Sequence, residues 1–284
     1  MPIKSILAPL TGFEQSEAAL VVALKLARKL GAFTDVLHVS PDPRDTIPLI
    51  SEGAAGPAIV RIMEMAEADA KKRAAAAEAL FRKACAAAGI VATGASAGVR
   101  YGTIVGRAPG EIALRARVHD LVLLGRVPED AEIEWRLSFE AALMEGGRPI
   151  LLLSKEPRET LGKSIAIAWN GSVEAAHAAS SALPFLAQAE HVLLLAGEKD
   201  EVPVEPSLDL VAEWLRHHGI TAAVKHVALK GWPVGAELAI EAAAAGADLI
   251  VMGGYGHSRM RETIFGGATR AVVNDSALPV LMAH

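Results

Sequence analysis

The chain carries one pattern of strands and helices twice, and this internal repeat limits its fold more than any other feature. Four segments of the first half recur in the same order in the second: 4–12 as 163–171, 106–111 as 231–237, 120–125 as 248–253, and 148–153 as 278–282. The repeated unit is much longer than the roughly 20–50 residues of a solenoid repeat. The repeat therefore predicts two similar domains and not an array of small units.

The repeat also predicts where the two domains meet. We expect a first domain over residues 1–153 and a second over residues 163–284, joined by residues 154–162. That joining segment is polar and contains Pro157 and Gly162, as is typical of a linker. A chain of 284 residues is long enough for two domains of ordinary size.

Within each half, short apolar runs alternate with longer Ala-rich segments of helical character. The predicted strands are 5–9, 34–39, 95–100, 121–125, 150–153, 164–169, 191–196, 222–228, 249–253 and 280–282. The predicted helices are 14–30, 59–88, 108–118, 135–145, 173–188, 208–218, 234–245 and 269–275. Such alternation predicts α/β domains, each an open five-stranded parallel sheet with helices on both faces, as in Rossmann-like folds.

A glycine-rich sequence follows the last but one predicted strand. The strand 248–252 leads directly into Gly253, and further glycines stand at Gly256, Gly266 and Gly267. Glycine lets backbone amides turn towards a bound anion, and a helix that begins nearby adds its own free amides. The sequence favours a phosphate site here, and the alternative is a tight strand-to-helix turn without a ligand.

This glycine spacing resembles the nucleotide-binding signature of the universal stress protein family. The signature is G-x-x-G, nine residues, then G and a Ser or Thr; Gly253, Gly256 and Gly266 match it, whereas Gly267 stands at the Ser or Thr position. The resemblance extends over both halves. It implies a tandem protein with the adenine-nucleotide alpha-hydrolase-like fold that binds an adenine nucleotide, above all ATP, in its second domain.

The resemblance also implies which residues contact the nucleotide. They are Ala168, Trp169, Asn170, Ala196, Met252, Gly253, Tyr255, Gly256, Gly266, Gly267, Ala268 and Thr269. The glycine-rich residues would offer amides to phosphates, Ala168 to Asn170 would border the ribose and base, and Ala196 would lie beside the adenine. Asn170 replaces the family's Asp, and its alternative role is a turn before a helix N-terminus. Any Mg²⁺ would bind through the phosphates.

The first half lacks this glycine signature. Gly125 is followed by Arg126, then by Pro128 and the acidic residues Glu129 and Asp130. Proline has no amide hydrogen, and carboxylates repel a phosphate. We therefore expect a degenerate nucleotide site in the first domain.

No catalytic constellation is visible, so a binding or signalling module is a better interpretation than an enzyme. Two alternatives stay open: a slow ATPase, for which His257 or Thr269 would have to position a water, and a ligand-free interaction scaffold. The net charge of −5 argues against nucleic-acid binding. The single cysteine, Cys85, excludes an internal disulfide framework.

The sequence also suggests how the chain is located and paired. No apolar stretch reaches about 18 residues without interruption by charge and no signal pattern is visible, so we expect a cytoplasmic protein without a membrane span. The last predicted strand of each half is short, apolar and preceded by proline, which suits an edge strand that needs a cover. We expect these strands to pair the two domains within one chain, and two chains could pair as a homodimer.

Overall fold

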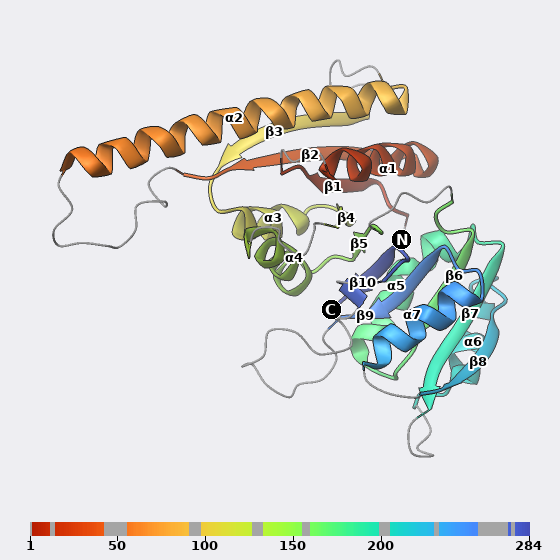
Figure 1. The fold of residues 1–284 in the computed structure, drawn as a ribbon. Coiled ribbons are helices and arrows are strands. Elements are labelled where there is room, and N and C mark those ends of the chain that lie inside the picture. Colours follow the sequence, from red (N-terminus) through yellow and green to blue (C-terminus); the bar gives the residue numbers. More distant parts are fainter. Residues whose placement is uncertain are drawn as a thin grey trace. The chain divides into compact units, whose positions relative to one another are not determined.

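The computed structural model describes residues 2–11, 15–42, 56–90, 98–126, 133–154, 160–198, 205–229, 233–254, 272–273 and 276–284. The chain forms two compact units (Figure 1). The N-terminal unit comprises residues 4–123 and 130–146, and the C-terminal unit comprises residues 1–3, 124–129 and 147–284.

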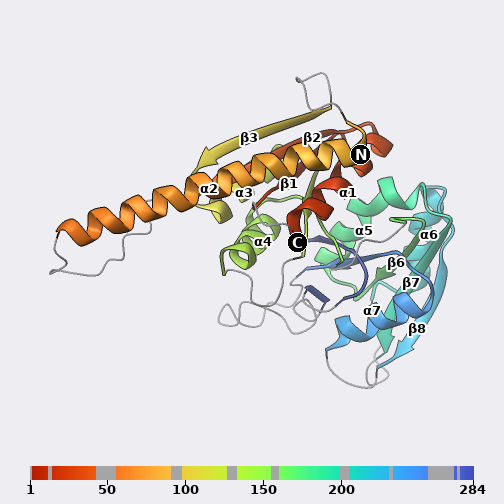
Figure 2. The same ribbon diagram turned by 45° about the horizontal axis from the view of Figure 1, so that its top comes forward.

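The N-terminal unit is a parallel sheet with helices packed on it. Its elements are β1 (Ser5–Pro9), α1 (Gln15–Leu30), β2 (Phe33–Ser40), α2 (Gly56–Ala88), β3 (Val99–Val105), α3 (Ala108–Ala116), β4 (Leu121–Leu124) and α4 (Ile133–Glu145). The strand order is β3-β2-β1-β4, and these neighbours run parallel. Helix α1 packs against α2, and α3 against α4. Figure 2 shows α2 continuing beyond the neighbouring strands β2 and β3.

One strand of this unit was predicted in the wrong place. The prediction of a strand at 95–100 is corrected to β3 at Val99–Val105. Residues 91–97 lie outside the described residues. β3 is an edge strand in which most side chains are half-buried or exposed, so it lacks the continuous apolar run on which the prediction relied.

The C-terminal unit contains a second sheet whose neighbouring strands run parallel except for β5, which is antiparallel to β10, so the expectation of a wholly parallel sheet is corrected here. Its elements are β5 (Ile150–Leu152), β6 (Ser164–Ala168), α5 (Val173–Leu186), β7 (His191–Glu198), α6 (Leu208–His217), β8 (Ala223–Ala228), α7 (Val234–Ala244), β9 (Leu249–Gly253) and β10 (Val280–Ala283). The strand order is β5-β10-β9-β6-β7-β8. Helix α7 lies on the opposite face from α5 and α6 (Figure 1), as right-handed crossovers require.

The last strands of the two halves lie side by side. β10 runs antiparallel to β5, with Leu281 opposite Leu151, and parallel to β9 on its other side. β5 therefore extends the C-terminal sheet, whereas the repeat assigns it to the first half. Since both strands belong to one compact unit, the pairing of two domains through them stays a prediction, as do the domain boundaries.

An aspartate accepts backbone N–H groups at the start of β1 and another does so at the start of β6. Asp248, immediately before β9, accepts the backbone N–H groups of Gly162, Lys163 and Ser164 at 2.9–3.1 Å. Asp120, immediately before β4, accepts those of Lys4 and Ser5 at 2.8 and 2.9 Å. The repeat seen in the sequence is thus also a repeat of hydrogen bonding.

Candidate functional site

The site lies where two neighbouring parallel strands of the C-terminal unit end. Ala168 of β6 is in register with Met252 of β9, so Trp169, just after β6, and Gly253, the last residue of β9, lie next to each other. After β6 the chain crosses to β7 on one side, and after β9 it passes to β10 on the other. Parallel α/β sheets place their ligand crevice at such a switch point.

Gly253 contacts the first turn of helix α5. A Cβ atom on Gly253 would lie 2.6 Å from the backbone N of Ala175 and 2.8 Å from the carbonyl carbon of Glu174. Real Cβ atoms essentially never come this close to backbone atoms. Glycine is therefore required here because the strand end and the helix N-terminus touch, a reason that the motif alone did not reveal.

The turn between β6 and α5 is held by its own side chains. Asn170 accepts the N–H of Ser172 through Oδ1 at 3.1 Å, and Gly171 has a φ of 76°. Ser172 is the N-cap residue of α5 and accepts the N–H of Ala175 through Oγ at 3.1 Å. The structure thus gives Asn170 the turn role that the sequence left as the alternative. Its exposed amide still lies at the site's edge.

Gly254, at the start of the glycine-rich sequence, makes hydrogen bonds within the protein. Gly254 donates its N–H to the carbonyl of Ala283 at 2.8 Å, and its own carbonyl lies 3.0 Å from Nδ1 of His284. The amide of Gly254 is therefore engaged beside β10. Amides that turn towards a phosphate would have to come from residues after Gly254.

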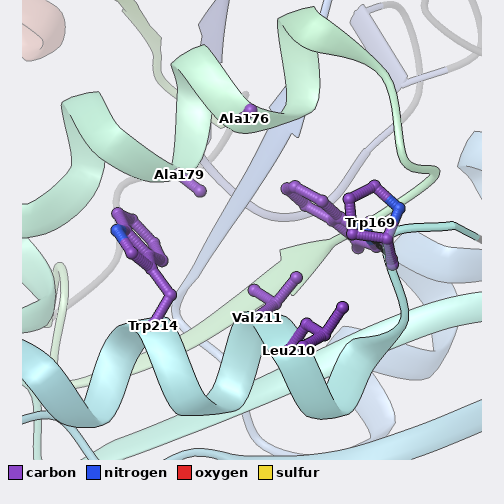
Figure 3. Close-up of a pocket in the computed structure, with 7 residues that line it drawn as sticks. Trp169, Ala176, Ala179, Leu210, Val211 and Trp214 are labelled. Atoms are coloured by element: carbon purple, nitrogen blue, oxygen red, sulfur yellow. Dashed lines mark hydrogen bonds between the residues drawn. The ribbon is translucent and has the colours of Figure 1, made fainter.

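An apolar pocket opens beside Trp169 (Figure 3). It has a volume of about 250 Å³ and is lined by Trp169, Ala176, Ala179, Pro206, Leu210, Val211 and Trp214. Helix α5 supplies its two alanines, and α6 supplies Trp214 and its neighbours. Among the described residues, no charged side chain lines it, and the indole N–H of Trp169 donates to the carbonyl of Pro206 at 2.8 Å. Such a pocket suits a flat, apolar group and not a phosphate.

Four of the predicted contact residues lie within strands: Ala168 in β6, Ala196 in β7, and Met252 and Gly253 in β9. The predicted strand 191–196 ends at Ala196, but β7 continues to Glu198 and pairs Ala196 with His226 of β8. Met252 is likewise inside β9 and is buried. Both side chains face the packed interior, so only their backbone could border a ligand. Tyr255, Gly256, Gly266, Gly267, Ala268 and Thr269 lie outside the described residues.

A carboxylate close to Gly253 was not identified from the sequence. Glu174 stands in the first turn of α5, and its Cβ would lie 3.0 Å from a Cβ on Gly253. Its half-buried side chain adds negative charge beside the end of β9. The available sequence signal was Ser172 followed two residues later by Glu174, a pattern typical of a helix N-terminus.

An ionic cluster lies in the N-terminal unit, near the amino ends of its strands, with Asp35 and His119 buried and Arg100 exposed. Asp35 receives Nε of Arg100 on Oδ1 at 3.1 Å, and Nε2 of His119 lies 3.4 Å from its Oδ2. Burial alone raises the pKa of Asp35, but the hydrogen bonds from His119 and Arg100 outweigh it and hold that pKa well below its usual range. Burial opposes the charge on His119, whereas Asp35 and the Arg115 carbonyl raise its pKa above the ordinary value.

Other kinds of site find little support in the described ranges. No three His, Cys, Asp or Glu side chains there are grouped to hold a metal ion. Within the same ranges, no helix combines the length and apolar character of a membrane span. Cys85 is buried, and burial raises the pKa of its thiol, which fits a packing role.

Comparison with known proteins gives a family and a fold. The family model described as the universal stress protein family matches residues 135–284. No curated protein sequence matches the chain. A universal stress protein from Archaeoglobus fulgidus DSM 4304 superposes with a TM-score of 0.68 at 16% identity, over 98% of this chain and 97% of that chain. Proteins from Pseudomonas aeruginosa strains UCBPP-PA14 and PAO1 give TM-scores of 0.57 and 0.56 at 13% identity, over 98% of this chain and 92% of theirs. At such low identity these likenesses concern the fold.

Proposed function

Because the chain belongs to the universal stress protein family, we propose that its second half binds an adenine nucleotide, foremost ATP, at the ends of β6 and β9. The observation that carries this proposal is the switch point itself, where Gly253 lies against the N-terminus of α5. The chain would act as a binding or signalling module of a stress response.

In this proposal, the glycine-rich sequence binds the phosphates. Amides of Tyr255, Gly256, Gly266, Gly267, Ala268 and Thr269 would bind them, next to Gly253. Helix N-termini favour anions, whereas the Glu174 carboxylate opposes them. A Mg²⁺ ion on the phosphates would offset that repulsion.

The base would bind on the other side of the site, next to Trp169. Ala168, Trp169 and Asn170 would border the ribose, the backbone of Ala196 would lie near the adenine, and the pocket beside Trp169 offers a place for the flat ring. Stacking of a base on an aromatic side chain is worth about 1–3 kcal/mol. This arrangement separates an apolar base end from a polar phosphate end, as a nucleotide requires.

Isothermal titration calorimetry of the full-length chain with ATP and Mg²⁺ tests the proposal. We expect one site per chain, and Gly256→Asp should weaken binding by at least about tenfold because its carboxylate would face a phosphate. The matched control is Pro128→Asp, the corresponding change in the first half, which should leave affinity unchanged. Two sites per chain, or equal losses from both changes, would contradict the assignment to the second half.

Adenosine, which has no phosphate, separates the two ends of the site. Trp214→Ala should weaken adenosine and ATP by the same factor because Trp214 lines the pocket for the base. Gly256→Asp should weaken ATP much more than adenosine. If Trp214→Ala changes neither affinity, the base does not use this pocket.

A further inference from the structure

Arg126 occupies the position in the first half that Gly254 holds in the second. The repeat aligns Gly125 with Gly253, so the next residues correspond. Arg126 is only 7% exposed. A guanidinium keeps its charge at any ordinary pH, and burying it is costly unless its N–H groups are bonded. Its partners therefore indicate what it does.

Arg126 bonds to two backbone carbonyls that are far along the chain from it. Nε donates to the carbonyl of Leu153, just after β5, at 3.1 Å. A terminal guanidinium nitrogen donates to the carbonyl of Val272 at 2.9 Å. Val272 and Val273 are helical and buried, and they follow the glycine-rich sequence. All these residues belong to the C-terminal unit.

The bond to Val272 is made where the chain leaves its helical residues for β10. The same carbonyl accepts the N–H of Ser276 at 3.2 Å. Ser276 in turn exchanges hydrogen bonds of 3.1 Å with the backbone of Leu278, next to β10. A cation beside the carbonyl end of a helix is favourable, because these carbonyls carry partial negative charge. Arg126 thus reinforces the last bonds before the final strand.

We propose that Arg126, supplied by the first half of the chain, is a positioning residue for Val272 and the residues that lead from it into β10, directly after the glycine-rich sequence of the second half. The first half lacks the glycine signature, and the residue that follows Gly125 bonds to Val272, which comes after the glycine-rich sequence of the second half. A segment that is already held in place loses less conformational freedom when a ligand binds beside it, so the anchor favours binding. This consequence for binding rests on the proposed nucleotide site.

Hydrogen exchange of the nucleotide-free, full-length protein tests the anchor directly. In Arg126→Gln, the peptide spanning residues 272–284 should exchange about tenfold faster than in the wild type, because local opening no longer breaks the two bonds. Arg126→Lys keeps the charge but not the two-pronged geometry, and should give an intermediate rate. If the glutamine variant does not fold, the exchange rate of residues 272–284 in the lysine variant tests the anchor instead.

Arg117→Gln is the matched control. Arg117 also donates to a carbonyl at a helix end, that of Glu145 at 3.2 Å, but it is exposed and lies in the N-terminal unit. The Arg117→Gln variant should leave exchange of residues 272–284 and affinity for ATP unchanged.

The effect on the proposed site is measured by ATP binding. Arg126→Gln should weaken the binding of ATP by about fivefold or more.

The outcomes separate the two proposals. Wild-type exchange in both Arg126 variants would overturn the anchor. Faster exchange with unchanged ATP affinity would overturn its role for the site. If the wild-type protein binds no nucleotide, the proposed function fails, and the exchange rates still decide whether Arg126 holds this segment.

Discussion

At the scale of single residues, the chain depends on a few charged side chains that bond to the backbone. Asp248 is 6% exposed, and its carboxylate accepts three N–H groups at the start of β6. Because Asp248→Ala leaves these donors without an acceptor, we expect a loss of about 1.5–3 kcal/mol in the free energy of unfolding. Asp248→Asn keeps one acceptor oxygen and should lose less. Urea denaturation measures both, and equal losses would show that the hydrogen bonds are not the cause.

The buried pair of Asp35 and His119 makes the stability of the N-terminal unit depend on pH. His119 has a raised pKa, so its contribution is complete below its ordinary value of 6.5 and is lost as the pH rises through the raised pKa. Asp35 has a lowered pKa, so its contribution is present above 3.8 and is lost as the pH falls. The pair should stabilise the fold most between these two values.

The comparison with His119→Gln isolates this effect. A second histidine, His38, affects the stability in the opposite direction. Burial lowers the pKa of His38, so its contribution to the free energy of unfolding is lost as the pH falls below 6.5. His38 is common to both proteins, so the difference between wild type and variant cancels it. That difference in the free energy of unfolding should shrink from pH 6 to pH 9. A difference that is constant over this range would show that His119 is not charged in the fold.

At the scale of elements, the contact between β9 and α5 determines the shape of the candidate site. Gly253→Ala would place a methyl group within 3 Å of two backbone atoms of α5, and the helix would have to move. We expect a loss of about 1–3 kcal/mol, the usual range for overpacking. Gly110→Ala in α3 is the control, since an added Cβ there meets nothing within 4 Å. Thermal unfolding of the two variants should differ clearly; equal melting temperatures would contradict the contact.

At the scale of the whole molecule, β10 depends on a strand from the first half of the chain. Val280, Leu281 and Met282 are fully buried between β9 and β5. A fragment of residues 160–284 lacks β5 and would expose this strand edge, so it should associate with itself. The full-length chain at the same concentration is the comparison. Sedimentation velocity measures the association, and a fragment that stays monomeric at high concentration would show that the β10 edge needs no cover.

Much of the fold could be predicted because it is encoded locally. Continuous apolar runs marked β1, β6 and β9, and the Ala-rich segments between them marked the helices. The prediction was wrong for β3, whose edge position gives it an open pattern of exposure. The family and the α/β class were confirmed, whereas the roles of the glycine-rich residues stay predictions.

What the sequence determined by itself was therefore the order of strands and helices, the internal repeat and the glycine spacing, because each depends on neighbours along the chain. The tertiary structure decided what depends on contacts between distant segments. It placed β5 beside β10, brought Trp214 near Trp169, and gave Arg126 a partner 146 residues away in Val272. Such contacts are invisible to periodicity, because they arise only when packing brings separate segments within hydrogen-bonding or van der Waals distance.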